Sequence, residues 1–202
     1  MAEIFSAILL LIAVIDPMGS VPVYLEATKN FDTNQRKKIA INSSLIAFFV
    51  LFFFIVVGQI ILDGMEISLE AFQISGGVIL FLFAISMVLG ESKPESEMSL
   101  ITDYKKVTIF PVALPSIASP GAILAVVLMT DNKIYSITQQ LITIVELAFV
   151  VGLTCLVLLV SNKIQKRIGE GGIIVISKVM GLILAAYAAQ SILSGIKTFF
   201  MS

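Results

Sequence analysis

Six apolar segments, each long enough to cross a lipid bilayer, constrain the fold of this chain more than any other feature. A transmembrane helix needs about 20 mainly apolar residues to cross the hydrocarbon core. The segments cover residues 4–25, 40–62, 71–90, 107–130, 141–160 and 173–196. Inside lipid each backbone N–H and C=O group must find a partner within the protein, and a helix provides one. The sequence therefore predicts an all-α integral membrane protein with six transmembrane helices.

The charge content excludes an ordinary soluble domain. Only 13% of the residues are charged and the mean hydropathy is +1.04, whereas soluble domains carry about 25% charged residues. The net charge is −1, and no basic stripe with interleaved aromatic residues is present, so we expect no nucleic-acid partner. The partner that the composition implies is the lipid bilayer. The sequence leaves the oligomeric state open, a homo-oligomer included.

The inventory of reactive side chains is short. The chain has no histidine and one cysteine, which removes the usual zinc and haem ligand sets, a Cys–His nucleophile and an internal disulfide. An intramembrane hydrolase would need a second catalytic Asp, a Ser–His pair or a metal cluster, and the sequence has no histidine and no second Asp in mid-span. We therefore expect no cofactor, no metal site and no enzymatic activity.

Lysine and arginine fall mainly in alternate connections, and this predicts the orientation. Ten of them lie in the connections after the first, third and fifth segments, whereas the opposite side has only Lys133 and Lys197. Basic residues near transmembrane helices stay on the cytoplasmic side. We therefore expect both termini outside and the connection 91–106 in the cytoplasm.

The first apolar segment is interrupted by the run Asp16-Pro17-Met18-Gly19-Ser20-Val21-Pro22. Proline removes a backbone donor and pushes the residue before it out of the helical region. The fourth segment is interrupted in the same way by the run from Pro111 to Ala122. Within it Ser119-Pro120, like Asp16-Pro17, places a capping side chain before a proline, which is a good helix start. The sequence thus predicts that helices 1 and 4 are broken near mid-membrane.

Matches at one spacing indicate an internal duplication. The capping pattern of residues 32–35 returns 104 positions later as residues 136–139, and Gly77 returns as Gly181. Asp16-Pro17 and Ser119-Pro120 lie 103 positions apart. We expect a first three-helix repeat at 1–90, a cytoplasmic linker at 91–106 and a second repeat at 107–202. Three helices is an odd number, so the second repeat would enter the membrane inverted, as in many secondary transporters.

The two breaks supply most of the candidate substrate-binding residues. A half-helix N-terminus carries roughly +0.5 charge and unsatisfied N–H groups, so it suits an anion. A zwitterion would fit with its carboxylate toward the second break and its ammonium toward the carboxylate of the first. Glu146, which lies within the fifth segment, could instead gate protons, pair with a cation or extend to the membrane interface. Asp16 could be a structural helix cap. The candidates are Asp16, Pro17, Gly19, Ser20, Asn42, Ser116, Ser119, Gly121 and Glu146.

Three stretches resemble the MarC family, also described as six-span neutral amino acid transporters. They are 16–22, 111–122 and the run 178–186, which begins at Lys178 where the family usually has arginine. The resemblance covers essentially the whole chain. It implies a multi-pass protein of the inner (cytoplasmic) membrane that transports small neutral amino acids such as glycine and alanine, with H⁺ or Na⁺ as the coupling ion. An exporter of another small solute with the same fold is the alternative.

Overall fold

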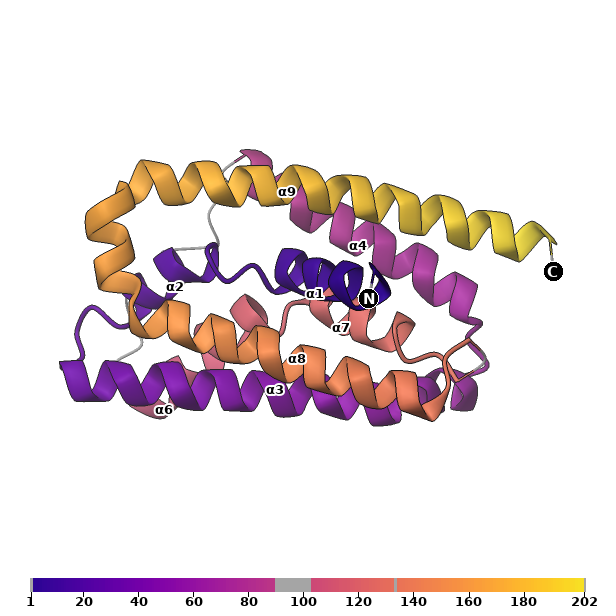
Figure 1. The fold of residues 1–202 in the computed structure, drawn as a ribbon, viewed down its shortest axis with the longest axis horizontal. Helices are drawn as coiled ribbons and strands as arrows, with labels where there is room; N and C mark the ends of the chain where they lie inside the picture. Colours follow the sequence, from indigo (N-terminus) through magenta and orange to yellow (C-terminus); the bar gives the residue numbers. More distant parts are fainter. Residues whose placement is uncertain (1, 90–102, 133, 202) are drawn as a thin grey trace.

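The computed structural model describes residues 2–89, 103–132 and 134–201, and most of these residues are helical (Figure 1). The predicted linker falls largely outside them. The elements are α1 (Ala2–Ile15), α2 (Ser20–Ala27), α3 (Thr33–Gly64), α4 (Leu69–Leu89), α6 (Tyr104–Val107), η1 (Thr108–Ile117), α7 (Pro120–Leu128), α8 (Ile137–Leu159) and α9 (Ser161–Met201). In this part of the chain the structure contains no strand.

Five helical stretches are long and apolar enough to cross a membrane, and a bent pair is a sixth candidate within the described residues. The pair joins Tyr104–Ile117 to Pro120–Leu128 at an angle of 56°. The first stretch, Ile4–Ala27, contains the first break. The prediction of an all-helical membrane protein is thus confirmed, and each predicted segment has a counterpart.

Two helices begin where the sequence pattern placed capping boxes. The Asp32 carboxylate accepts a hydrogen bond from the Gln35 N–H at 2.8 Å, and the Gln35 side chain accepts one from the Asp32 N–H at 3.1 Å. Ser136 and Gln139 make the same reciprocal pair at the start of α8. Such caps satisfy backbone donors that have no partner within the helix. They extend α3 and α8 several residues beyond the purely apolar segments.

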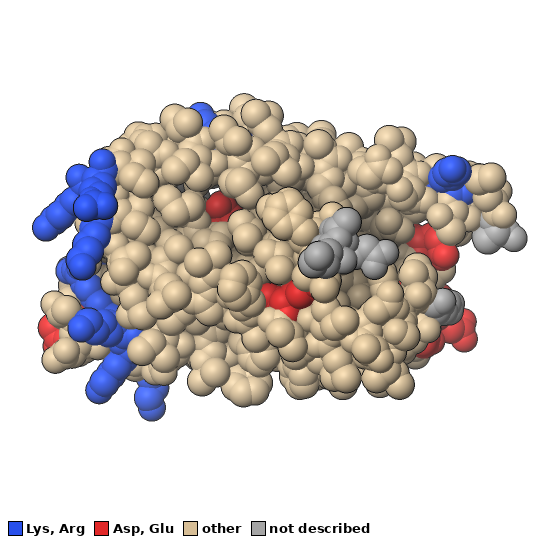
Figure 2. Space-filling model, in the orientation of Figure 1, with Lys and Arg blue, Asp and Glu red and all other residues tan. Residues whose placement is uncertain are grey.

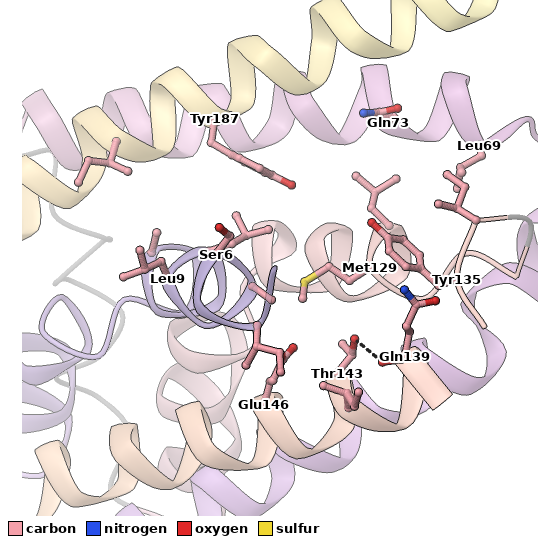
Figure 3. Close-up of a pocket in the computed structure, with 18 residues that line it drawn as sticks. Ser6, Leu9, Leu69, Gln73, Met129, Tyr135, Gln139, Thr143, Glu146 and Tyr187 are labelled. Atoms are coloured by element: carbon pink, nitrogen blue, oxygen red, sulfur yellow. Dashed lines mark hydrogen bonds between the residues drawn. The ribbon is translucent and has the colours of Figure 1, made fainter. Parts of the chain in front are cut away.

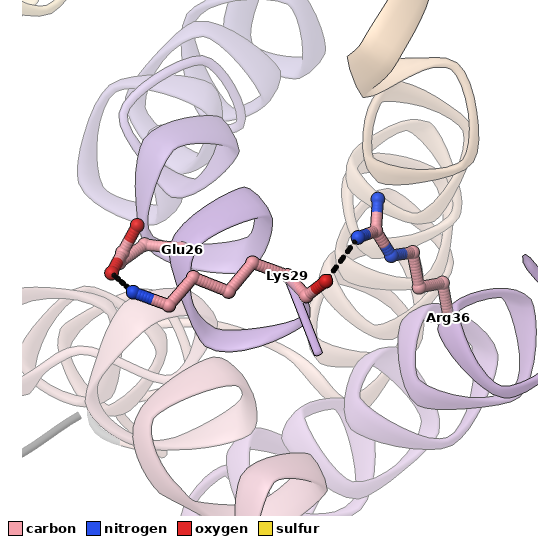
Figure 4. Close-up of polar contacts among 3 residues, drawn as sticks. All are labelled: Glu26, Lys29 and Arg36. Atoms are coloured by element: carbon pink, nitrogen blue, oxygen red, sulfur yellow. Dashed lines mark hydrogen bonds and ion pairs between the residues drawn. The ribbon is translucent and has the colours of Figure 1, made fainter. Parts of the chain in front are cut away.

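The turn between α2 and α3 is held by one guanidinium group. Arg36 donates hydrogen bonds to the carbonyl oxygens of Thr28, Lys29 and Phe31 at 2.8–3.0 Å. Figure 4 shows the Lys29 contact beside the exposed ion pair of Lys29 with Glu26. An exposed pair contributes little to stability, so the turn depends on Arg36.

The broken spans form the middle of the bundle (Figure 1). α3 and α8 run antiparallel along one side, and α4 and α9 lie on the other. α1, α2, η1 and α7 lie between these pairs, and their core side chains are fully buried. Examples are Leu11, Val14, Ile15, Val112 and Ile117, each 0% exposed. The long helices therefore shield the two breaks from lipid.

Small residues bring α4 and α9 close together. A Cβ atom built on Gly77 would lie 3.3 Å from the Ala188 carbonyl oxygen, and one on Gly181 would lie 3.2 Å from that of Ala84. Packing of this kind, with glycine against a facing backbone, is common between transmembrane helices. The two contacts also show that α4 and α9 are antiparallel, since Ala84, the later residue of α4, faces Gly181, the earlier residue of α9.

The two ends of the bundle differ in charge. Most Lys and Arg side chains visible in Figure 2 gather at the end where α2, α6 and the start of α9 lie, and acidic side chains gather at the other. We call these the basic end and the acidic end. Residues 161–168 of α9 cross the basic end (Figure 1) before the helix bends at Gly169, whose φ of +74° favours glycine.

Candidate functional site

The two breaks are hydrogen-bonded to each other. The Ser116 hydroxyl donates to the Ser20 hydroxyl at 3.0 Å, and the Ser20 hydroxyl in turn contacts the Ser116 carbonyl oxygen at 3.3 Å. Ser20 is 2% exposed and Ser116 is 4% exposed. These residues are 96 positions apart in the chain. The prediction placed both in one site, and the structure brings them into direct contact.

Ser119 makes the second link between the breaks. Its hydroxyl accepts a hydrogen bond from the Ala122 N–H at 3.1 Å and donates one to the Val14 carbonyl oxygen at 2.9 Å. It is the N-cap of α7 with Pro120 at the first helical position, as the sequence predicted. The Val14 carbonyl lies in the last turn of α1. Ser119 therefore caps α7 in the second broken span and also provides a hydrogen bond to a carbonyl group of the first.

Asp16 joins the end of α1 to the start of α2. Its N–H still bonds to the Ile12 carbonyl, and its φ of 47° then turns the chain. Its carboxylate accepts a hydrogen bond from the Gly19 N–H at 3.0 Å. The prediction that the second half-helix starts at Pro17 is wrong by a few residues: α2 begins at Ser20 with Gly19 as N-cap. The carboxylate nevertheless bonds to an N–H three residues on, as a capping side chain does.

At two predicted glycines an added Cβ atom would collide with a neighbouring side chain. A Cβ atom on Gly19 would lie 1.9 Å from the nearer carboxylate oxygen of Asp16, so a side chain there would displace the cap. One on Gly121 would lie 2.2 Å from a methyl group of Leu80. Gly19 has a φ of −67°, which any residue can adopt. The close approach therefore explains the glycine at 19, and backbone freedom does not.

The structure places Asn42 away from this contact. Its side chain is exposed on α3 and donates a hydrogen bond to the Tyr104 hydroxyl of α6 at 2.8 Å. Pro17, by contrast, is buried within the first break. Asn42 thus connects α3 to the short helix that precedes η1.

Glu146 lies on a cavity beside the breaks (Figure 3). The cavity has a volume of about 880 Å³, and residues of α1, α4, α7, α8 and α9 line it. It extends from Leu69 and Tyr135, near the acidic end, to Ala13 and Glu146. Ala13 directly precedes Val14, whose carbonyl bonds to Ser119. The floor of the cavity therefore adjoins the linked breaks.

The Glu146 carboxylate faces this cavity without a partner. Glu146 is 5% exposed, and no hydrogen bond or ion pair joins its side chain to another described residue. Within the described lining it is the one charged side chain, and most of the other lining residues are apolar. A buried carboxylate in such surroundings is costly when ionised and unpaired. It is therefore suited to take up a cation.

Sequence reasoning identified Glu146 but not the other polar groups of the cavity. These are Ser6, Gln73, Tyr135, Gln139, Thr143 and Tyr187. The spacing of Gln139, Thr143 and Glu146 is a signal that could have found part of this set, since residues three, four and seven apart share one helix face. Figure 3 shows Thr143 bonded to the backbone of Gln139 on that face.

Together the helices and the linked breaks define a class: a multi-pass helical membrane protein with two interrupted spans in its core. Comparison with known proteins gives the family. A model described as "MarC family integral membrane protein" matches residues 1–200, and the chain belongs to the MarC family. No solved structure matches it.

Three relatives cover almost the whole chain. The UPF0056 inner membrane protein YhgN of Escherichia coli K12 is 34% identical over 197 residues, which is 98% of both chains. A UPF0056 membrane protein of Buchnera aphidicola (subsp. Baizongia pistaciae) is 31% identical over 200 residues, 99% of both chains. One of Methanocaldococcus jannaschii is 32% identical over 189 residues, 92% of this chain and 91% of the relative. The chain is thus an integral membrane protein, with a relative that is named an inner membrane protein.

Proposed function

We propose that this protein is a secondary active transporter of small neutral amino acids such as glycine and alanine, coupled to H⁺ or Na⁺. The observation that carries the proposal is the pair of broken spans, which are hydrogen-bonded through Ser20, Ser116 and Ser119 beside a cavity of about 880 Å³. Interrupted membrane helices are tolerated where they line a site, and transporters place their substrate there. A protein that served only as a scaffold would have no need of two costly breaks in its core.

The proposal includes two inverted three-helix halves. Its support is the contact pattern between α4 and α9. Gly77 faces the backbone of Ala188, and Gly181 faces that of Ala84. Gly181 lies 104 positions after Gly77, and Ala84 lies 104 positions before Ala188. The second contact is therefore the first one with the two halves of the chain exchanged. A two-fold relation between the halves would produce this exchange. An antiparallel pairing of α3 with α8 (Figure 1) fits the same relation.

The direction of access follows from charge. The basic end would face the cytoplasm by the positive-inside rule. The cavity extends from the acidic end, so in this conformation it would admit a solute from outside. The linked breaks lie between the cavity floor and the basic end, and one half would rock against the other to expose the opposite side. In this conformation the Asp16 and Ser119 side chains bond within the protein, and the cavity supplies the space for the solute.

The experiment that tests the function is exchange in proteoliposomes. Vesicles preloaded with unlabelled glycine or alanine are given the labelled amino acid outside, for wild type and Asp16→Asn. We expect saturable exchange by the wild type and a loss in the variant. If the wild type exchanges neither amino acid but does exchange another small solute from a panel, the amino acid assignment is refuted and the alternative of a different solute takes its place. If it exchanges nothing while correctly folded, the transport proposal fails.

A further inference from the structure

We infer that the Glu146 cavity is the amine-recognition site of the protein: the carboxylate binds the ammonium group of a neutral amino acid, and the apolar wall accepts its side chain. This rests on the proposed function and specifies where and how the solute is held. The inference also assigns separate roles to the two parts of the core: the breaks hold the two halves of the chain together, and the cavity selects the solute.

The first step is the state of the carboxylate. Glu146 is 5% exposed, and its side chain has no hydrogen-bonding or ionic partner among the described residues. Figure 3 shows it projecting from α8 on the same side as Gln139 and Thr143. Within a membrane protein, an ionisable side chain that faces an internal cavity marks a pathway or a binding site for a charged group. A cation bound in the cavity would supply the partner that the described residues do not.

The second step is the kind of cation. Metal ions in proteins are held by four or more converging ligands. Among the described residues no group of three His, Cys, Asp or Glu side chains lies close enough to hold one, and the cavity lining carries a single carboxylate. One carboxylate suits an ammonium group, which is satisfied by one ionic contact and neutral oxygens. Ser6 and Thr143 of the lining carry such oxygens.

The third step is the rest of the ligand. A volume of about 880 Å³ lies within the range of about 300–1,000 Å³ that small-molecule sites occupy. It exceeds what glycine or alanine needs. The wall is formed largely by aliphatic side chains, among them Leu9, Leu10, Leu128 and Ile183. The site should therefore require the amine strictly and accept larger aliphatic side chains as well as small ones.

The fourth step concerns the other titratable groups that face Glu146. The described lining contributes Tyr135 from the connection before α8 and Tyr187 from α9, and α1, α4 and α7 contribute none. Neither phenol supplies a positive charge. The ammonium of a ligand would thus meet a carboxylate with no competing cation from the lining.

The experiment measures binding to the purified full chain in lipid nanodiscs by calorimetry. The probes are L-alanine, L-valine, alaninol (an amine without a carboxylate) and propionate (a carboxylate without an amine). We expect the wild type to bind both amino acids and alaninol but not propionate. In Glu146→Gln the affinity for the three amines should fall at least about 30-fold, the usual size for the loss of one partner of a buried charge pair. Glu146→Asp should retain part of the wild-type affinity for these amines.

A matched control and a folding check keep the result interpretable. Glu70→Gln makes the same chemical change at the start of α4, outside the cavity lining, and should bind all amines as the wild type does. Glu146→Gln removes an unpaired buried charge, so its thermal unfolding temperature should equal or exceed that of the wild type. Unaltered amine binding by Glu146→Gln, or equal binding of propionate and alaninol by the wild type, would overturn the inference.

The transport assay separates this inference from the proposed function. Exchange of alanine with unaltered KM in Glu146→Gln would leave the function standing and refute the amine site. Amine binding that depends on Glu146, without any exchange by the wild type, would support the site and refute the transporter. A wild type that neither binds amines nor exchanges amino acids would refute both.

Discussion

Replacing Gly19 with alanine tests the structure of the first break most directly. The added Cβ atom would lie 1.9 Å from one carboxylate oxygen of Asp16 and 2.7 Å from the carboxylate carbon. The carboxylate must move, and it loses the hydrogen bond from the Gly19 N–H at 3.0 Å. Asp16 is 6% exposed, so water cannot replace the bond fully. Loss of a hydrogen bond to a charged group costs about 1.5–3 kcal/mol.

Backbone entropy works in the opposite direction. Alanine in place of glycine gains at most about 1 kcal/mol, because alanine restricts the unfolded chain more than glycine does, and the φ of −67° at Gly19 permits the substitution. The net loss should be about 0.5–3 kcal/mol, which lowers the unfolding temperature by about 1–12 °C in a chain of this length. The matched control is Gly152→Ala in α8, where an added Cβ would meet nothing within 4 Å. That variant should be neutral or more stable.

The assay is thermal unfolding in detergent with a thiol-reactive fluorophore. The chain has no tryptophan and one cysteine, and Cys155 is half-buried in α8, so its reaction reports opening of the bundle. In an Asp16→Ala background the clash is gone, and Gly19→Ala should cost nothing further. Equal stability of Gly19→Ala and Gly152→Ala, or an undiminished cost in the Asp16→Ala background, would refute the capping argument.

Three further predictions concern the rest of the bundle. Ser119→Ala should lower the free energy of unfolding by about 1–3 kcal/mol, because it leaves a buried carbonyl and a helix N-terminus unsatisfied; the same unfolding assay measures it, and an unchanged midpoint would contradict it. Gly77→Leu and Gly181→Leu should destabilise the protein to a similar degree, since each faces a backbone carbonyl of the opposite helix; a large cost at only one position would argue against the two-fold relation. In a cysteine-free background, Thr198→Cys in whole cells should react with an impermeant maleimide added outside and Asn162→Cys should not, and the reverse labelling would invert the proposed orientation.

Local features of the fold could be predicted from the sequence. The apolar segments and both capping boxes depend on residues within a few positions of each other. The start of α7 at Pro120 behind Ser119 is of the same kind. The start of α2 was predicted less well. The pattern placed it at Pro17, but Asp16 has a positive φ of 47° that turns the chain, and α2 begins only at Ser20. A sequence pattern gives the capping residue but not the geometry of the turn around it.

The contacts between distant segments could not be predicted. That Ser116 would bond to Ser20, and Ser119 to Val14, depends on how the two broken spans pack in three dimensions. Spacing gave the candidates, but it could not say which groups bond to each other, or that Asn42 would lie apart from the breaks and bond to Tyr104. The cavity is harder still, since most of its lining is aliphatic and comes from five helices. Glu146 was recognisable only because a charge within a membrane span is costly.

The chemistry of the contact between the breaks suits a gate. Three hydrogen bonds join them: between the Ser116 and Ser20 hydroxyls, from Ser20 to the Ser116 carbonyl, and from Ser119 to the Val14 carbonyl. Each is neutral and contributes about 0.5–1.5 kcal/mol, so their sum is of the order of the few kcal/mol that separate two populated conformations. A buried charge that is left without its partner costs about 3–5 kcal/mol, so an ion pair at the same place would be harder to separate than these neutral hydrogen bonds. In the proposed transporter, a solute held at Glu146 would leave toward the basic end by separation of this contact, since Ala13 lines the cavity and the next residue, Val14, bonds to Ser119. In the proposed transporter, hydroxyl groups would keep the path closed at rest and would still allow the energy of binding one ammonium group to open it.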